Sequence, residues 1–219
     1  MKVDFAKVRT YLVTDPRLNG GRDEETVIRQ AVARGGVDLV QFRSKHLTKR
    51  EYFAQAVHLA GICRELGVPL LLNDHVDIAA LVDCDGIHVG QSDLPPSEVR
   101  KLLGPGKTIG LSTHTVEQAQ AAQDSGADYI NIGPVFATAT KDTPVVPVGL
   151  EMVRAVTAIS RLPVTTMGGI KHANAADVVL AGADRVAVVT AITEATDISE
   201  SAATLKSIVE GARQARGPL

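Results

Sequence analysis

The chain has 219 residues, of which 45% are hydrophobic and 22% charged, and its formal net charge is -2. Aromatic residues make up only 3%, and the 23 basic residues form no run, so the composition argues against a nucleic-acid partner. The two cysteines show no disulfide or metal-binding spacing, and the N-terminus holds no apolar block long enough for a signal peptide or membrane span. We therefore expect residues 1–219 to form a single domain in the cytoplasm, without a membrane partner.

A short pattern recurs along the chain: a helical segment, a glycine, an acidic residue and a run rich in Val, Ile and Leu. It occurs in ARGGVDLVQF, DSGADYINIG and LAGADRVAVV. Glycine ends a helix in the left-handed conformation, and the apolar run after it is typical of a strand buried on both faces. In chain order, the pattern predicts strands near residues 8–14, 38–43, 69–73, 86–90, 108–112, 129–133, 163–167 and 185–190.

Helical segments are expected between these strands. The second is the clearest, because Thr48 and Glu51 in TKREYF have capping-box spacing. Its expected apolar face consists of Phe53, Ala56, Val57 and Ala60. Eight alternations of strand and helix without a flexible linker favour an α/β fold of the closed (β/α)8 TIM-barrel type over an open doubly wound sheet.

In such a barrel, reactive groups stand at the C-terminal ends of the strands, and these ends are polar here. The end of the second strand carries Gln41, Arg43 and Lys45 at alternate positions, so these three side chains are expected to face one space. Two cations on one side favour an anionic ligand. The alternative is a solvated strand end whose charges serve solubility.

Two acids follow neighbouring strands, Asp74 after the third and Asp93 after the fourth. Their carboxylates would repel each other unless a cation or a proton lay between them. Mg²⁺ meets that need, because it takes one or two carboxylates and completes its coordination with water and phosphate oxygens. Alternatively, each aspartate, taken alone, caps the helix that follows it.

A second anion site is predicted after the last two strands. Gly168 and Gly169 follow the seventh strand, and Val189 and Thr190 end the eighth. Loops at this place in a barrel bind phosphate through backbone N–H groups that glycine leaves accessible. The loop after the sixth strand adds hydroxyls and a cation, and it is either a cover for the site or a merely solvated loop; these side chains are Thr138, Thr140 and Lys141.

Taken together, the strand ends resemble those of the thiamine phosphate synthase family. The matching segments run in order over nearly the whole chain: YLVTD, QFRSK, LLNDHVDIA, GIHVGQSDLP, GLSTHT, GADYINIGPVFATATKDT, MGGI and GAD followed by VVTAI. The resemblance implies a transferase that joins a hydroxymethylpyrimidine diphosphate to a thiazole phosphate, releasing pyrophosphate and thiamine phosphate, with Mg²⁺ as cofactor. The implied partners are small-molecule substrates.

The resemblance also implies roles for individual residues. The pyrimidine diphosphate would be held by Gln41, Phe42, Arg43, Ser44, Lys45, Asn73 and Lys141. Ser112 would meet the pyrimidine, and the Mg²⁺ ligands would be Asp74 and Asp93. The thiazole phosphate would be received by Thr138, Ala139, Thr140, Gly169, Val189 and Thr190. The implied catalytic set is Arg43, Lys45, Ser112 and Lys141.

The chain departs from the family pattern in small ways that affect affinity more than chemistry. Thr190 stands where serine is common, Ser92 stands where an acid is frequent, and Lys141 is not joined by a second lysine. Three rivals stay open at this stage: a thiazole tautomerase of the same superfamily, another phosphate-binding barrel such as an aldolase, and a non-catalytic sensor of thiamine intermediates. Oligomeric state is undecided, as are the roles of His46, His75, His88 and His114.

Overall fold

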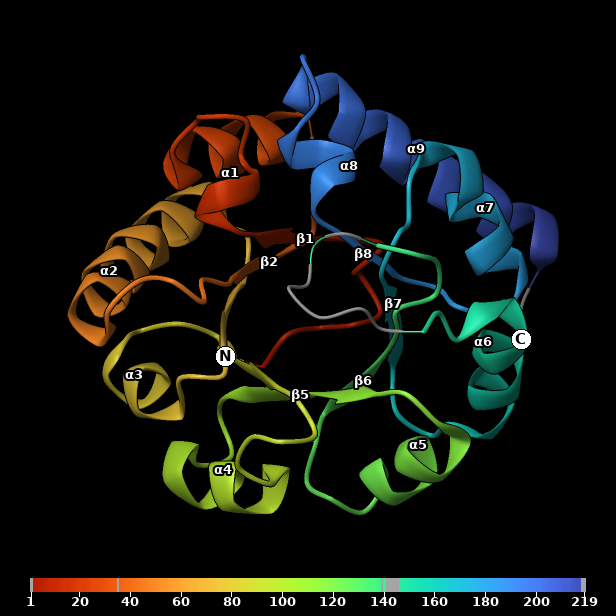
Figure 1. Cartoon of the computed structure of the whole chain (residues 1–219), viewed down its shortest axis with the longest axis horizontal. Coiled ribbons are helices and arrows are strands. Elements are labelled where there is room, and N and C mark those ends of the chain that lie inside the picture. The colour runs from red at the N-terminus through yellow and green to blue at the C-terminus, as the bar shows by residue number, and fades with distance from the viewer. Residues whose placement is uncertain (1, 35, 139, 141–145, 218–219) are drawn as a thin grey trace.

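The computed structural model describes residues 2–34, 36–138, 140 and 146–217. Eight parallel strands form a closed barrel in which each strand pairs with the next in the sequence and β1 pairs with β8 (Figure 1). The strands are β1 (Thr10–Thr14), β2 (Leu39–Phe42), β3 (Leu70–Asn73), β4 (Gly86–Val89), β5 (Thr108–Thr113), β6 (Tyr129–Ile132), β7 (Val164–Met167) and β8 (Val186–Val188).

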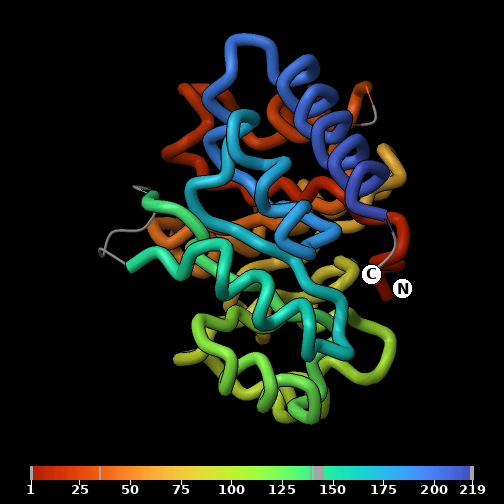
Figure 2. The backbone as a smooth tube through the Cα atoms, turned by 90° about the vertical axis from the view of Figure 1, so that its right-hand side faces the viewer, coloured from red at the N-terminus to blue at the C-terminus, as the bar shows by residue number. Residues whose placement is uncertain are grey.

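Helices surround the barrel on the outside. They are η1 (Pro16–Leu18, a 3-10 helix), α1 (Glu24–Ala33), α2 (Lys49–Leu66), α3 (Val76–Leu81), α4 (Pro96–Leu103), α5 (Val116–Ala122), α6 (Gly149–Ile159), α7 (His172–Leu180), α8 (Thr190–Thr193) and α9 (Ile198–Arg216). The last helix, α9, packs against both α1 and α7 and so completes the outer ring (Figures 1 and 2). Within the described residues, no helix is long and apolar enough to cross a membrane.

The (β/α)8 TIM barrel expected from the repeated pattern is confirmed, and each expected strand range overlaps an observed strand. The last range was too long. The strand β8 ends at Val188, and Thr190 is the first residue of the short helix α8. The apolar run therefore continues from strand into helix, and its composition alone does not mark the change.

The helix α2 confirms its expected start and corrects its expected face. The Thr48 hydroxyl accepts from the backbone N–H of Glu51, and the Glu51 carboxylate accepts from the backbone N–H of Thr48 at 2.8 Å. Phe53 and Val57 are 39% and 49% exposed, so the face expected from them is wrong. The buried stripe recurs every three or four residues from the preceding position: Tyr52, Ala56, Leu59, Ala60 and Cys63.

Strand residues alternate between two hydrophobic layers, as the period of two requires. One layer lies between the strands and the helices and includes Leu12, Val40 and Ile130. The other fills the inside of the barrel; its buried members are Phe5, Val8, Tyr11, Val13, Leu39, Leu71, Tyr129 and Ala187. Phe5 and Val8 belong to the segment before β1, so the N-terminal segment helps to fill the barrel interior.

The inward-facing positions become polar toward the C-terminal ends of the strands. Leu39 and Leu71 lie in the inner apolar layer, whereas the next inward positions on the same strands, Gln41 and Asn73, line a cavity. The next strands place polar side chains in the same cavity, namely His88, Ser112 and Asn131. The alternation of each strand therefore delivers polar groups to one end of a barrel whose middle is packed.

We expect Gly86→Ala to destabilise the barrel. Gly86 pairs with Thr108 across β4 and β5, and a Cβ atom at Gly86 would overlap the Thr108 backbone carbonyl, which cannot move without breaking the pairing. Such overpacking costs about 1–3 kcal/mol, measurable as a lower free energy of unfolding in urea. The control is Gly61→Ala in α2, where a Cβ meets nothing within 4 Å and a gain of about 0.5–1 kcal/mol is expected. Equal effects of the two changes would contradict the overlap.

Candidate active site

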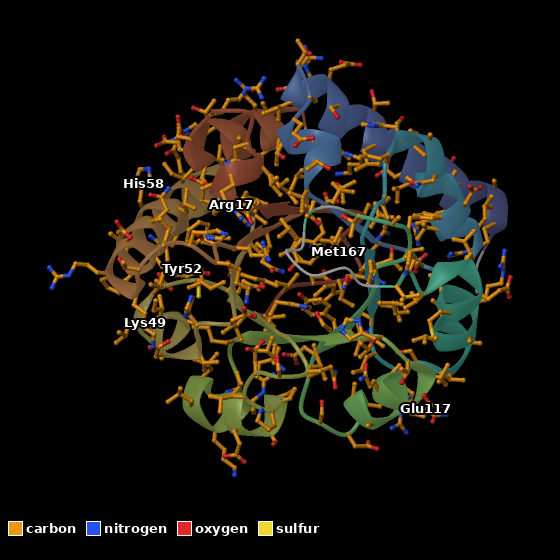
Figure 3. All side chains as sticks on the ribbon, viewed as in Figure 1. Arg17, Lys49, Tyr52, His58, Glu117 and Met167 are labelled. Carbon is orange, nitrogen blue, oxygen red and sulfur yellow. The ribbon has the colours of Figure 1, made fainter. Side chains whose placement is uncertain are left out.

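Two adjoining cavities lie at the C-terminal end of the barrel. The first, of about 600 Å³, is lined from β1 to β7, and the second, of about 380 Å³, lies over β7 and β8. They share Thr138, Thr140, Met167 and Gly168. Met167 lies near the centre of the ring, whereas Tyr52 lies out at the helical layer (Figure 3). A cavity of about 730 Å³ near the N-terminal ends of β1 and β3 is remote from this end, where barrels of this kind place their chemistry.

The side chains of residues 41–45, at the end of β2 and just after it, alternate between two sides, as their spacing predicted. Gln41, Arg43 and Lys45 line the first cavity. Phe42 is fully buried in the outer layer with its ring 4.6 Å from that of Tyr52. The Ser44 hydroxyl accepts from two backbone N–H groups that follow it. The side chains of Gln41, Arg43 and Lys45 thus face the cavity, whereas Phe42 and Ser44 are not among its lining residues.

Both cations of this stretch are held by carboxylates. Arg43 Nη1 donates to Asp15 Oδ2 at 2.6 Å, and the Asp15 side chain is only 1% exposed. Lys45 Nζ donates to the Asp74 carboxylate. Asp15 also caps the short helix η1, so the turn after β1 fixes the position of Arg43 on β2. An arginine held in this way loses little conformational freedom when an anion binds.

Asp74 and Asp93 lie together at the rim of the first cavity. Burial raises the pKa of the Asp93 carboxyl, and the adjacent negative charge of Asp74 raises that pKa further. Neither aspartate is a helix cap, so the capping alternative is wrong: the cap positions of α3 and α4 are His75 and Pro95. Asp74 instead has φ of 60°, and Asp93 accepts from the backbone N–H of Gly90 at 2.7 Å.

The donor set at this rim suits a hard cation. Among the residues that the structure describes, no group of three or more His, Cys, Asp or Glu side chains surrounds a common point. Two adjacent carboxylates are nevertheless the protein contribution typical of Mg²⁺, which takes its other ligands from water and phosphate. The raised pKa of Asp93 agrees with this, because two close carboxylates need positive charge between them.

Amide and hydroxyl groups form the floor of the first cavity. Ser112 Oγ lies 2.8 Å from His88 Nε2, and the backbone carbonyl of Ser112 accepts from Gln91. The Asn131 side-chain oxygen accepts from Thr165 at 2.9 Å, which leaves the Asn131 amide nitrogen for the cavity. Asn73 lies beside them on β3, and its backbone N–H donates to the phenol of Tyr52.

The four histidines near the mouth differ in their surroundings. His88 is buried and bonded at both ring nitrogens. His114 lines the cavity and donates from Nδ1 to the carbonyl of Gly133 at 2.5 Å. His75 packs its ring 4.4 Å from that of Tyr52, and His46 is exposed. Structural hydrogen bonds therefore account for the two that line the cavity.

The second cavity has the features expected of an anion site. Gly168 and Gly169 have φ of 99° and 65°, and a Cβ at Gly169 would overlap the backbone oxygen of Ala137. Both positions thus require glycine. Val189 and Thr190 also line this cavity, and the Thr190 hydroxyl accepts from Lys171 Nζ at 2.5 Å.

The loop after β6 contributes to both cavities. The hydroxyls of Thr138 and Thr140 lie 2.9 Å apart and face the two cavities at their junction. The predictions for Ala139 and Lys141 fall outside the described residues.

Some groups of the site were missed in the sequence. Lys171 lies two residues after Gly169 of the second cavity, and this position was a usable signal. Asn131 lines the cavity near the end of β6, as Asn73 does at the end of β3, so alternation could have found it. Asp15 gave no such signal, because its role depends on a contact with a residue 28 positions away.

Known proteins resemble this chain over most of its length. A family model described as thiamine monophosphate synthase matches residues 10–192. The thiamine-phosphate synthase of Chloroflexus aurantiacus is 44% identical over 201 residues, which is 92% of each chain. That of Shouchella clausii is 42% identical and covers 94% of this chain and 98% of its own.

A solved structure extends the match to three dimensions. The thiamine phosphate pyrophosphorylase of Pyrococcus furiosus superposes with a TM-score of 0.85 at 33% sequence identity. The match covers 95% of this chain and 98% of that one. The chain therefore belongs to the thiamine monophosphate synthase family, and it is a transferase of thiamine biosynthesis.

Proposed function

We propose that the chain joins 4-amino-5-hydroxymethyl-2-methylpyrimidine diphosphate to a thiazole phosphate, giving thiamine phosphate and pyrophosphate. The observation that carries this proposal is that two cations, Arg43 and Lys45, and two acids, Asp74 and Asp93, line one cavity, next to a second cavity lined by glycines. The first cavity suits a diphosphate with its metal ion. The second suits a monophosphate.

The first cavity would act on the departing diphosphate. Breaking the bond between carbon and diphosphate leaves negative charge on the departing oxygens, and Arg43 and Lys45 are placed to stabilise that charge. Lys141 is assigned to the same task by its place in the family motif. The aminopyrimidine is electron-rich and can bear the resulting cation, so the substitution is dissociative and needs no protein nucleophile.

Asp74 and Asp93 would hold Mg²⁺ in this scheme. The bound ion would supply positive charge to the departing diphosphate. The protein's own part is to keep the two carboxylates adjacent, through the Gly90 backbone donor to Asp93 and the Lys45 ammonium beside Asp74. Lys45 is then positioned to move between its carboxylate and the diphosphate when the substrate binds.

The second cavity would receive the thiazole phosphate. Backbone N–H groups around Gly169 and Val189 can approach an anion closely, because glycine has no side chain in the way. The Thr190 hydroxyl adds a donor, and Lys171 adds a positive charge beside it. Glu194 also lines this cavity and would repel a phosphate. The attraction of Lys171 for the phosphate would exceed this repulsion only when the Lys171 ammonium faces the phosphate. Thr138, Ala139 and Thr140 complete the proposed site.

The pyrimidine ring would lie over the floor of the first cavity, against Gln41, Asn73 and Ser112. These groups offer neutral hydrogen bonds, which suit a ring with an amino group and ring nitrogens. We propose that residues 1–219 act as one unit in the cytoplasm, on small molecules and without nucleic-acid or membrane partners.

We expect Asp93→Asn to lose Mg²⁺-dependent release of pyrophosphate while the protein stays folded. Removing one such electrostatic contact slows turnover by about 100- to 1,000-fold. The measurement is thiamine phosphate formation from both substrates over a range of Mg²⁺ concentrations. The control is Asp77→Asn, which removes an exposed acid of α3 that pairs with Lys49 away from the cavity. Unchanged turnover and metal dependence in Asp93→Asn would count against the assignment, whereas Asp77→Asn should match the wild type.

Thr190→Val and Lys171→Met should each raise the KM for the thiazole phosphate, by about 10-fold, because each removes one donor to the phosphate. The KM for the pyrimidine diphosphate should change by less than about twofold, since that substrate lies in the other cavity. Lys101→Met is the control, because Lys101 pairs with Glu98 on the outer surface of α4. Equal rises in both KM values would contradict the proposal that the two substrates bind in separate cavities.

A further inference from the structure

A chain of hydrogen bonds runs through the barrel interior beneath the first cavity. Ser112 Oγ lies 2.8 Å from His88 Nε2, and His88 Nδ1 lies 2.7 Å from the Tyr129 phenol. That phenol lies 3.0 Å from the phenol of Tyr11, which in turn accepts from the amide nitrogen of Gln41. Both ends of the chain, Ser112 and Gln41, line the cavity, whereas the two tyrosines do not.

The middle of this chain is shielded from solvent. Tyr11 and Tyr129 are fully buried, and His88 is 4% exposed. Burial raises the pKa of both phenols, so each stays neutral and carries one proton. Gly110 leaves the space that the Tyr129 ring occupies, and Phe5 packs against the same ring with centroids 4.6 Å apart. Each phenol proton must therefore find its acceptor within the chain, because a buried unpaired donor is costly.

Counting donors fixes the direction of these bonds. The Gln41 amide nitrogen can only donate, so the Tyr11 oxygen accepts and its proton goes to Tyr129. The proton of Tyr129 then goes to His88 Nδ1, which must be unprotonated. A neutral imidazole with a bare Nδ1 carries its proton on Nε2, and that proton goes to the Ser112 oxygen. The hydroxyl proton of Ser112 is then left to point into the cavity.

We propose that this chain holds His88 as the Nε2–H tautomer and makes the Ser112 hydroxyl a donor toward the ligand. Tyr11, Tyr129 and His88 are positioning residues, because the two tyrosines do not line the cavity and both ring nitrogens of His88 are bonded to Tyr129 and Ser112. With its nitrogen bound to Tyr11, Gln41 offers its carbonyl oxygen to the same cavity. The cavity thus presents one donor and one acceptor from two strands, a pair that an amino-substituted nitrogen heterocycle can satisfy.

The identity of this ligand rests on the proposed function, but the direction of the bonds does not. The first test is therefore made on the free protein. Nitrogen-15 NMR of histidine-labelled protein at neutral pH distinguishes the two neutral tautomers of His88 and the imidazolium, with the signal assigned by its loss in His88→Gln. We expect the Nε2–H tautomer. The Nδ1–H tautomer overturns the proposal because it reverses the donor at Ser112, and an imidazolium overturns it because a protonated Nδ1 cannot accept from Tyr129.

The second test removes one link of the chain. In Tyr129→Phe, His88 Nδ1 loses its donor, so we expect a mixture of tautomers and a fall of about 5- to 30-fold in kcat/KM for the pyrimidine diphosphate. The fall should include a raised KM for the pyrimidine diphosphate while the KM for the thiazole phosphate stays within about twofold, whereas a general loss of stability would lower the apparent kcat and leave both KM values unchanged. A wild-type kcat/KM in Tyr129→Phe would overturn the positioning role.

A matched control removes a buried hydroxyl outside the chain. Thr10 precedes Tyr11 on β1, and its hydroxyl donates to the carbonyl of Gly36 at the other end of the barrel. Thr10→Val should lower stability and leave both the His88 tautomer and the kinetic constants unchanged. Should the wild type form no thiamine phosphate yet show the Nε2–H tautomer, the proposed function fails and the inference on the hydrogen-bond chain stands.

Discussion

The site depends on the closure of the barrel, in which the backbone hydrogen bonds of β1 to β8 complete a ring of parallel strands. Parallel pairing puts all eight C-terminal ends at one edge, and closure makes that edge a circle. Residues as distant in sequence as Gln41 and Thr190 are therefore brought to adjoining cavities. Inward-facing strand residues supply neutral polar groups of the first cavity, such as Gln41, Asn73 and Asn131, and the loops after the strands supply its charged groups.

The charges of the site are balanced within the protein. Arg43 is held by Asp15, and Lys45 by Asp74. An incoming diphosphate and its metal ion would exchange partners with these pairs: the anion competes for the cations, and the metal ion competes for the acids. This exchange would limit the desolvation cost of binding, because Arg43, Lys45 and Asp74 each have an oppositely charged partner before the substrate arrives.

Much of the fold could be predicted from the sequence because its signals are local. A glycine near the end of a helix, followed by an apolar run, marks the start of several strands, and alternation correctly placed Gln41 and Lys45 on one side of the chain. By the same alternation Phe42 lies in the outer hydrophobic layer, although the resemblance to the family motif implied that it holds the substrate. The family motif covers the continuous stretch of residues 41–45, whereas only every second residue of that stretch lines the cavity.

The remainder of the site could not be read in this way, because it depends on contacts across the barrel. His88 meets Ser112 and Tyr129, which are 24 and 41 residues away, and Tyr11 meets Tyr129 over 118 residues. The capping interpretation of the two aspartates failed for a related reason. Local patterns allow a cap, but the backbone of Asp74 turns into the left-handed region and carries its side chain to the rim instead.

The ring of Phe5 gives the start of the chain a role that an N-terminal segment seldom has. Ends of chains usually tolerate trimming and fusion, since few contacts hold them. Here Phe5 packs against Tyr129, so the segment before β1 fills the barrel interior beneath the residues that line the first cavity. A single layer of side chains thus separates the segment before β1 from the cavity at the opposite end of the barrel.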